Sequence, residues 1–231
     1  MRNEIPRQEA QKVAILSLPF KIPEMQRLSY DLSALQDIKV PYIWLVGAMG
    51  CGRNVQAESM QQNYGFEVIK ISNLLRANAT NDTDRGRVIK ENLDLKNGYI
   101  PNTIILDLLK EEMLAKAKQT SGFIINGFPI NREQADMFVK EIGPVDVIIV
   151  FKCSHSVMLE RYAQKMPHLT KQEIKAKLRQ YTSHVKSSLQ KYDTKVEKFD
   201  TSKETADEIF PRIQSAMNVR IFGEAAKNIL E

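Results

Sequence analysis

Three glycines and a basic residue lie close together, directly after a short apolar run that ends at Val46. Glycines at this spacing let the backbone turn tightly and point several N–H groups at a phosphate. A helix that starts at the basic residue would add the positive end of its dipole. The residues of this loop that we expect to contact a nucleotide are Gly47, Gly50, Cys51, Gly52, Arg53, Asn54 and Val55.

The loop departs from the phosphate-binding pattern G-x-x-x-x-G-K-[ST] at its two most reactive positions. In that pattern the lysine contacts the phosphates and the next hydroxyl contacts magnesium. Arg53 stands in place of the lysine, and neither Asn54 nor Val55 supplies a hydroxyl. Arginine keeps the charge, but it is bulkier and forked, so it replaces a compact ammonium poorly in a tight loop. Arg53 therefore has two interpretations, a phosphate contact or an exposed arginine at a helix start.

A strand and a helix must hold this loop, and the sequence predicts both. Residues 42–46 are apolar throughout, which predicts a buried strand, and residues 55–63 predict a helix. Further strands are predicted at 66–71, 122–127, 145–151 and 196–199, and further helices at 74–78, 87–96, 101–118, 132–140, from 157, at 172–191 and after 202. Strands that alternate with helices predict an α/β fold, a parallel sheet flanked by helices with its ligand site at the carboxyl ends of the strands.

Two local signals refine the helix boundaries. Ser72 or Asn73 is expected to cap the helix at 74–78, because short polar side chains bond the free N–H groups of a first turn. Pro211 is expected to kink or restart the last helix, because proline has no N–H to donate.

Composition narrows the class of protein. A chain of 231 residues that is 43% hydrophobic and 26% charged fits one domain with a sizeable core. No apolar run approaches the ~18 residues of a membrane span, and no block of like charge indicates nucleic acid. The net charge of +5 suits either a phosphate-binding protein or a solvated lysine-rich surface.

Cysteine and histidine usage adds two expectations. Cys51 and Cys153 are too few for a disulfide framework, and the N-terminus lacks the apolar core of a signal peptide, so we expect a reducing, cytoplasmic location. The histidines His155, His168 and His184 show no metal-binding spacing, so we predict no metal ligands among them.

Residues 1–40 differ from the rest of the chain, because three prolines interrupt any long helix there. Leu28, Leu32 and Leu35 fall near helical spacing and predict one short amphipathic helix. This N-terminal extension precedes the first core strand. It is either a docking arm for another protein or a strap that packs on its own domain.

Further motifs follow the loop in a fixed order. They are residues 72–76 (SNLLR), 85–87 (RGR), 98–101 (GYIP) and 122–129 (GFIINGFP), then Gln134, and then Arg161 on the helix after the strand at 145–151. The series resembles adenylate kinase, a nucleoside monophosphate kinase, over roughly residues 40–220. The resemblance implies a P-loop NTPase-type parallel sheet in a domain at 41–231. It also implies a small NMP-binding (nucleoside monophosphate) insertion at about 71–100 and a reduced lid at about 166–173.

The resemblance implies a chemistry for the loop and the lid. In adenylate kinases ATP and AMP are held with Mg²⁺ while a phosphoryl group passes in line, so catalysis is positioning plus positive charge. Arg53 and Arg161 match two of the catalytic cations. Arg161 has a second interpretation as an ordinary salt-bridge partner.

The resemblance also implies an AMP site. Arg76 matches the arginine that grips the AMP phosphate, and Gln134 matches the glutamine that reads the adenine edge. Ile100 matches an apolar backbone contact to the base, and Gly127, the last residue of the strand predicted at 122–127, is expected to contact the nucleotide. Arg76 has a second interpretation as a salt-bridge partner, and Gln134 as a surface glutamine.

Several family positions have lost their chemistry here. Asn126 replaces an aspartate that supports Mg²⁺, and an amide gives that site no negative charge. Ile130 replaces an arginine that binds phosphate, and Lys165 replaces a second lid arginine. Loss of one such contact costs ~10²–10⁵ in rate. We therefore expect phosphotransfer to be weak or absent and Mg²⁺ to be poorly supported.

Two functions remain open on these observations. The first is a pseudoenzyme that still binds ATP or AMP, or that serves as a structural or docking module with a protein partner at residues 1–40. The second is an active nucleoside monophosphate kinase in which Arg53 does the work of the lysine. Neither function predicts nucleic acid or a membrane as a partner.

Overall fold

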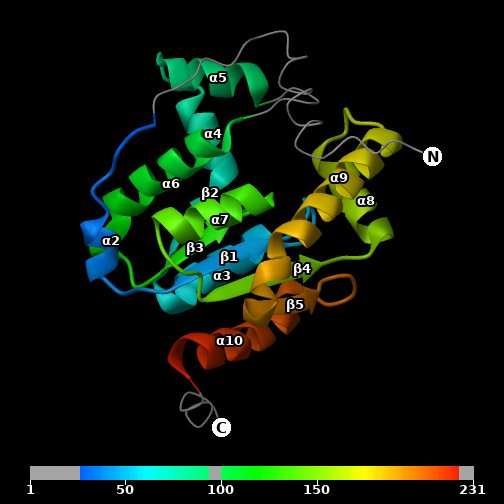
Figure 1. The fold of residues 1–231 in the computed structure, drawn as a ribbon. Coiled ribbons are helices and arrows are strands. Elements are labelled where there is room, and N and C mark those ends of the chain that lie inside the picture. Colours follow the sequence, from blue (N-terminus) through cyan, green and yellow to red (C-terminus); the bar gives the residue numbers. More distant parts are fainter. Residues whose placement is uncertain (1–26, 94–99, 224–231) are drawn as a thin grey trace, which may run out of the picture.

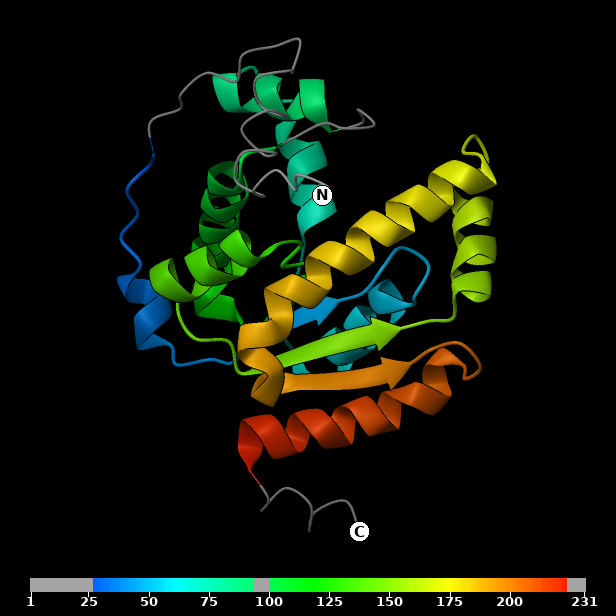
Figure 2. The same ribbon diagram turned by 45° about the vertical axis from the view of Figure 1, so that its right-hand side comes forward.

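The computed structural model describes residues 27–93 and 100–223 of the chain. Within these ranges, parallel strands form one sheet in the order β2-β3-β1-β4-β5. The strands are β1 (Tyr42–Val46), β2 (Glu67–Lys70), β3 (Phe123–Asn126), β4 (Val147–Lys152) and β5 (Val196–Asp200). Helices cover both faces of the sheet (Figures 1 and 2), so the predicted α/β fold is confirmed.

The central strand β1 shows why residues 42–46 are apolar at every position. Tyr42, Trp44 and Val46 belong to one buried layer, and Ile43 and Leu45 belong to the other, because successive side chains of a strand point to opposite faces. The first layer lies under α6 (Asn102–Lys116), α7 (Arg132–Glu141) and α9 (Lys171–Leu189), and the second under α3 (Arg53–Tyr64) and α10 (Ala206–Phe222). Burial on both faces is typical of a parallel sheet.

Two helical units extend beyond the sheet. The predicted NMP-binding insertion contains α4 (Ile71–Asn78) and α5 (Asp84–Asn92), and α8 (His155–Lys165) forms a hairpin with the long helix α9 (Figure 2). The remaining short helices are α2 (Ser33–Asp37), η1 (Ala117–Gln119) and η2 (Gln190–Lys195). Thr170 and Glu173 form a capping box at the start of α9. Residues 171–173 of the predicted lid at about 166–173 therefore belong to α9.

Some predicted boundaries were wrong for identifiable reasons. The helix after β2 begins at Ile71 with no loop before it, so neither Ser72 nor Asn73 caps it. The next helix begins at Asp84, because Thr83 accepts a bond from the Gly86 N–H and caps it. Its predicted end at residue 96 lies outside the described residues.

The last helix also differs from its prediction. α10 is capped by Thr205 and runs through Pro211 as one element, so the expected restart does not occur. The missing N–H of Pro211 removes one intrahelical hydrogen bond, and a capping box between Thr205 and Glu208 supports the first turn just before it.

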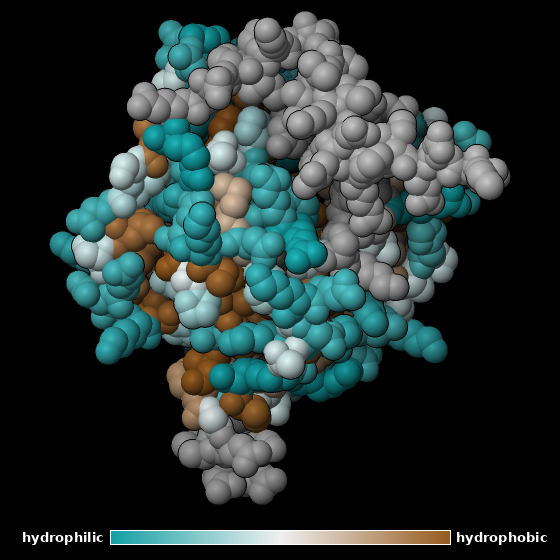
Figure 3. Space-filling model, viewed as in Figure 1, coloured by the Kyte–Doolittle hydropathy of each residue, from teal (hydrophilic) through white to brown (hydrophobic). Residues whose placement is uncertain are grey.

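The described part of the N-terminal extension packs on its own domain. Leu35 of α2 is 2% exposed, and its carbonyl accepts a hydrogen bond from the Tyr42 hydroxyl at 3.3 Å. Apolar side chains come to the surface on the side where α2 lies beside α6 (Figure 3). Residues 27–40 therefore contact the domain, residues 1–26 lie outside the described part, and the choice between a strap and a docking arm stays a prediction.

Candidate functional site

The glycine-rich loop connects the end of β1 to the start of α3, as predicted. Gly50 and Gly52 have φ values of 87° and 86°, a conformation that side chains disfavour. A Cβ atom at Gly47 would collide with the sulfur of Cys51. These three positions therefore require glycine for the shape of the loop itself.

Cys51 fills space inside this loop. Its side chain is 1% exposed, and burial raises the pKa of its thiol, an effect that the nearby Arg53 guanidinium only partly offsets. A helix start can lower the pKa of a cysteine, but desolvation wins here. Cys51 is consequently a packing residue and not an activated thiol.

A tyrosine from α9 reaches into the base of the loop. The backbone N–H of Gly47 donates a hydrogen bond of 2.6 Å to the Tyr181 hydroxyl oxygen. Burial raises the pKa of Tyr181 to about 12, although the Arg53 charge acts in the opposite direction, so the hydroxyl stays protonated at neutral pH. The first amide of the loop is thus already satisfied by the protein's own side chain.

Arg53 is the first residue of α3, and its guanidinium lies over the turn that follows β3. Gly127 in that turn has a φ of 87°, a conformation that favours glycine, and a Cβ atom placed on it would be 2.9 Å from Nη1 of Arg53. The Nε atom of Arg53 is buried and has no hydrogen-bond partner among the described residues. Arg53 therefore brings a positive charge to the loop and to the carboxyl end of β3, and its contact with a nucleotide stays a prediction.

The positions that would support Mg²⁺ hold two amides and a valine. Asn126 at the end of β3 is 5% exposed, and its Nδ2 donates to Oδ1 of Asn54 at 2.8 Å. Val55 is 49% exposed and carries no oxygen. The described residues also contain no group of three or more His, Cys, Asp or Glu that could hold a metal. This donor set does not fit Mg²⁺, which binds through carboxylates and phosphate oxygens.

Arg161 connects the loop to the far side of the site. Its Nη1 donates to the Gly50 carbonyl at 3.2 Å and to the Thr201 carbonyl at 3.4 Å. The same nitrogen lies 4.0 Å from the sulfur of Cys153. In this arrangement the guanidinium ties α8 to the loop and to the residue after β5.

The predicted AMP residues are placed differently from one another. Arg76 of α4 is exposed, and Ile100 is half-buried. Gln134 is 1% exposed: its Oε1 accepts from the Ile130 N–H at 3.1 Å, and its Nε2 donates to Asn102 Oδ1 at 2.9 Å. Both polar ends of Gln134 are therefore engaged within the protein, and its role toward adenine stays a prediction.

The sequence model of the adenylate kinase family matches residues 45–197. The chain belongs to the adenylate kinase family. It is 26% identical to Adenylate kinase 1 of Drosophila melanogaster over 186 residues, which are 78% of this chain and 80% of that protein. It is 32% identical to Adenylate kinase isoenzyme 5 of Mus musculus over 127 residues, which are 55% of this chain and 22% of that protein. It is 30% identical to Adenylate kinase isoenzyme 1 of Gallus gallus over 123 residues, which are 53% of this chain and 63% of that protein.

These matches cover unequal parts of the relatives. The chain spans most of the length of the fly protein but only about a fifth of the mouse protein. The parallel sheet with the loop after β1 agrees with a P-loop NTPase-type adenylate kinase fold. In the described ranges, no helix is long and apolar enough to cross a membrane.

One residue of this candidate site was not predicted from the sequence. Tyr181 lies within the helix predicted at 172–191, and 134 positions separate it from Gly47. Helical periodicity predicts which face of α9 is buried, but not which loop that face meets. A tertiary contact of this length leaves no local signal in the sequence.

Proposed function

We propose that this member of the adenylate kinase family is a pseudoenzyme in which phosphotransfer is weak or absent. The single observation that carries the proposal is the hydrogen bond from the Gly47 N–H to the Tyr181 hydroxyl. A phosphate that used this amide would have to displace the hydroxyl of the half-buried Tyr181. It would then leave that hydroxyl without its partner, at a cost of about 1–3 kcal/mol.

The other contacts of the site support the same conclusion. Arg161 already donates hydrogen bonds to two backbone carbonyls of the protein. The Asn54–Asn126 amide pair provides no negative charge for Mg²⁺. Ile130, which takes the place of a phosphate-binding arginine, is 44% exposed and apolar. Catalysis of phosphoryl transfer depends almost entirely on positioned positive charge, so several such losses together should reduce the rate severely.

We also propose that the protein binds a nucleotide. Arg53 and the exposed Arg76 still present positive charge beside the loop and on the insertion, so ATP or AMP is the expected ligand, held without Mg²⁺.

We place the protein in a reducing, cytoplasmic compartment, because both cysteines are free thiols. A protein partner that binds residues 1–40 would compete with the contacts between this extension and the domain.

The proposal is tested by a coupled assay of ADP formation from ATP and AMP with Mg²⁺. Adenylate kinase 1 of Drosophila melanogaster serves as the reference, because it matches most of this chain. We expect turnover at least about 10³-fold below the reference, the factor that the loss of one or two charge contacts gives. Turnover within tenfold of the reference would refute the proposal.

An active kinase is the alternative, favoured by the position of Arg53 as a cation between the loop and β3. The same assay on Arg53→Ala separates the two. If any turnover of the wild-type chain depends on Arg53, it falls in this variant, whereas a contaminating kinase leaves it unchanged. A thermal-shift series with ATP, AMP and a bisubstrate dinucleotide then tells a nucleotide binder from an inert scaffold.

A further inference from the structure

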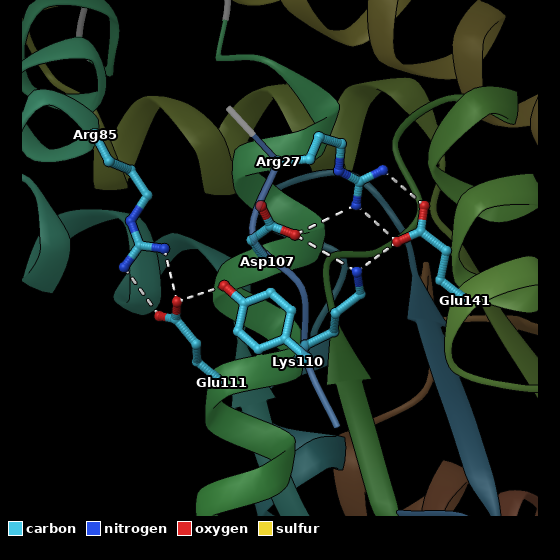
Figure 4. A network of polar contacts seen from close by, with 7 residues as sticks. Arg27, Arg85, Asp107, Lys110, Glu111 and Glu141 are labelled. Atoms are coloured by element: carbon cyan, nitrogen blue, oxygen red, sulfur yellow. Dashed lines mark hydrogen bonds and ion pairs between the residues drawn. The ribbon is translucent and has the colours of Figure 1, made fainter. Parts of the chain in front are cut away.

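The described part of the N-terminal extension enters a network of charged side chains on the domain (Figure 4). Two of its residues, Arg27 and Tyr30, contribute to that network. They contact Asp107, Lys110 and Glu111 of α6 and Glu141 of α7, and Glu111 in turn binds Arg85 of α5. Arg85 belongs to the predicted NMP-binding insertion, so the network joins three separate parts of the chain.

Arg27 completes the charge balance on one side of the network. It donates to both carboxylate oxygens of Glu141, at 2.9 and 2.7 Å, and to Asp107 at 3.3 Å. Lys110 is bonded to the same two carboxylates, and Lys110 and Asp107 are 5% and 6% exposed. Without Arg27 two carboxylates would share one ammonium in a largely buried place, which is costly. The domain therefore presents a built site for the guanidinium of the extension.

Tyr30 links this site to the insertion. Its hydroxyl donates to Oε1 of Glu111 at 2.7 Å, and Arg85 grips both oxygens of the same carboxylate at 2.8 and 2.9 Å. The Lys110 ammonium lies 5.3 Å from the centre of the Tyr30 ring. Because a bidentate pair needs one fixed carboxylate orientation, the Tyr30 hydroxyl helps to hold Glu111 in the position that Arg85 requires.

The course of the chain fits this link. The segment before α2 runs along α6 from α2 toward α5 in both ribbon views (Figures 1 and 2). The extension thus lies on the outside of α6. Its described part begins at Arg27, beside the ion pairs of Glu141, and continues to Tyr30, beside Glu111.

We propose that Arg27 and Tyr30 form a latch that holds α5 of the insertion against α6. With the latch docked, Glu111 fixes Arg85 and the insertion keeps its place. With the latch released, α5 becomes free to move away from α6. The latch does not depend on nucleotide binding or on phosphotransfer, so it stands or falls apart from the proposed function.

Hydrogen exchange of the full chain, followed by mass spectrometry, tests the latch. The variants are Arg27→Ala, Tyr30→Phe and both together. Arg220→Ala, which breaks an ion pair between α10 and Glu197 of β5, is the matched control. We expect the double variant to speed exchange of the α5 amides at least about threefold while β1 and β4 stay protected, and the control to leave α5 unchanged.

Two results would overturn the latch. Unchanged α5 exchange in the double variant would show that the extension is only a strap. An equal increase in α5, β1 and β4 would show that it stabilises the whole domain instead of holding α5.

A second comparison checks that the effect passes through Glu111. Arg85→Ala alone should speed α5 exchange, and adding Tyr30→Phe to it should change α5 exchange no further, because the link is already broken. Additive effects of the two substitutions on α5 would also contradict the latch.

Discussion

The Tyr181 hydroxyl accepts the hydrogen bond of the Gly47 N–H at 2.6 Å, which joins the middle of α9 to the first glycine of the phosphate-type loop. The shape of this loop is retained, since Gly50 and Gly52 keep the positive φ values that the turn needs. A family fold can therefore keep its loop while a side chain of the same chain takes up a donor of that loop.

Tyr181→Phe tests how much this bond contributes to the fold. Removal of the hydroxyl leaves the Gly47 N–H without an acceptor, so we expect the free energy of unfolding to fall by about 1–3 kcal/mol. Urea unfolding followed by the fluorescence of Trp44, the single tryptophan, measures the change. Tyr162→Phe is the matched control, because Tyr162 is a buried tyrosine of α8 that packs beside Ala48 of the loop. Equal losses in the two variants would mean that the Tyr181 hydroxyl has no special role.

Restoring the loop chemistry should help most when Tyr181 is also removed. The triple variant Arg53→Lys, Val55→Thr, Asn126→Asp regains the ammonium, the hydroxyl and the carboxylate of the family pattern. On its own we expect it to raise affinity for ATP with Mg²⁺ modestly, and with Tyr181→Ala at least about tenfold more, because the loop amide becomes available. Calorimetric titration of the wild type, the triple variant, Tyr181→Ala and the combination of the last two measures this coupling. The idea fails if the triple variant alone reaches the full affinity.

The sheet was predictable because its central strand is buried on both faces, so Ile43 and Trp44 must both be apolar. The loop was predictable because glycine spacing is a local property of the backbone. The start of α4 was not, since β2 runs into it at Ile71 without the polar turn that usually marks a boundary.

The partners of the site residues were the least predictable part. Gln134 was assigned to a ligand by its place in a motif, yet its amide bonds the Ile130 N–H and the Asn102 side chain. Motif spacing gives the position of a side chain along an element. It does not reveal whether that side chain points to a ligand or fixes a nearby turn, because the answer depends on residues far away in the sequence.

Gln134→Ala separates these two roles. If Gln134 fixes the turn after β3, the substitution removes two hydrogen bonds of a buried side chain and should lower stability by about 2 kcal/mol, with little change in the thermal shift caused by AMP. Gln164→Ala, at an exposed position on α8, is the control and should change neither quantity. Loss of the AMP response at nearly unchanged stability would instead support adenine recognition.

The ion-pair cluster around Glu141 should make the fold sensitive to acid. Hydrogen bonding from Arg27, and then from Lys110, lowers the pKa of Glu141 from its usual 4.5 to about 2, in spite of partial burial. A carboxylate with a lowered pKa in the folded state contributes stability above its unfolded value and loses it as the pH falls through the folded value. The contribution of Glu141 should therefore be complete above about pH 5 and disappear between about pH 4.5 and pH 2.

Glu141→Gln tests this linkage directly. The neutral amide cannot pair with Arg27 and Lys110 as a charge, so we expect a loss on the order of 1–2 kcal/mol at pH 6 that shrinks as the pH falls toward 3. Urea unfolding at intervals between pH 6 and pH 3 measures both curves. Glu204→Gln, which removes the carboxylate of the exposed pair with Arg212, should give a curve nearly parallel to the wild type. If the stability curve of Glu141→Gln is also parallel to that of the wild type, Arg27 does not hold the extension through a charged Glu141. The side chains around Glu141 would then stabilise the domain by packing alone.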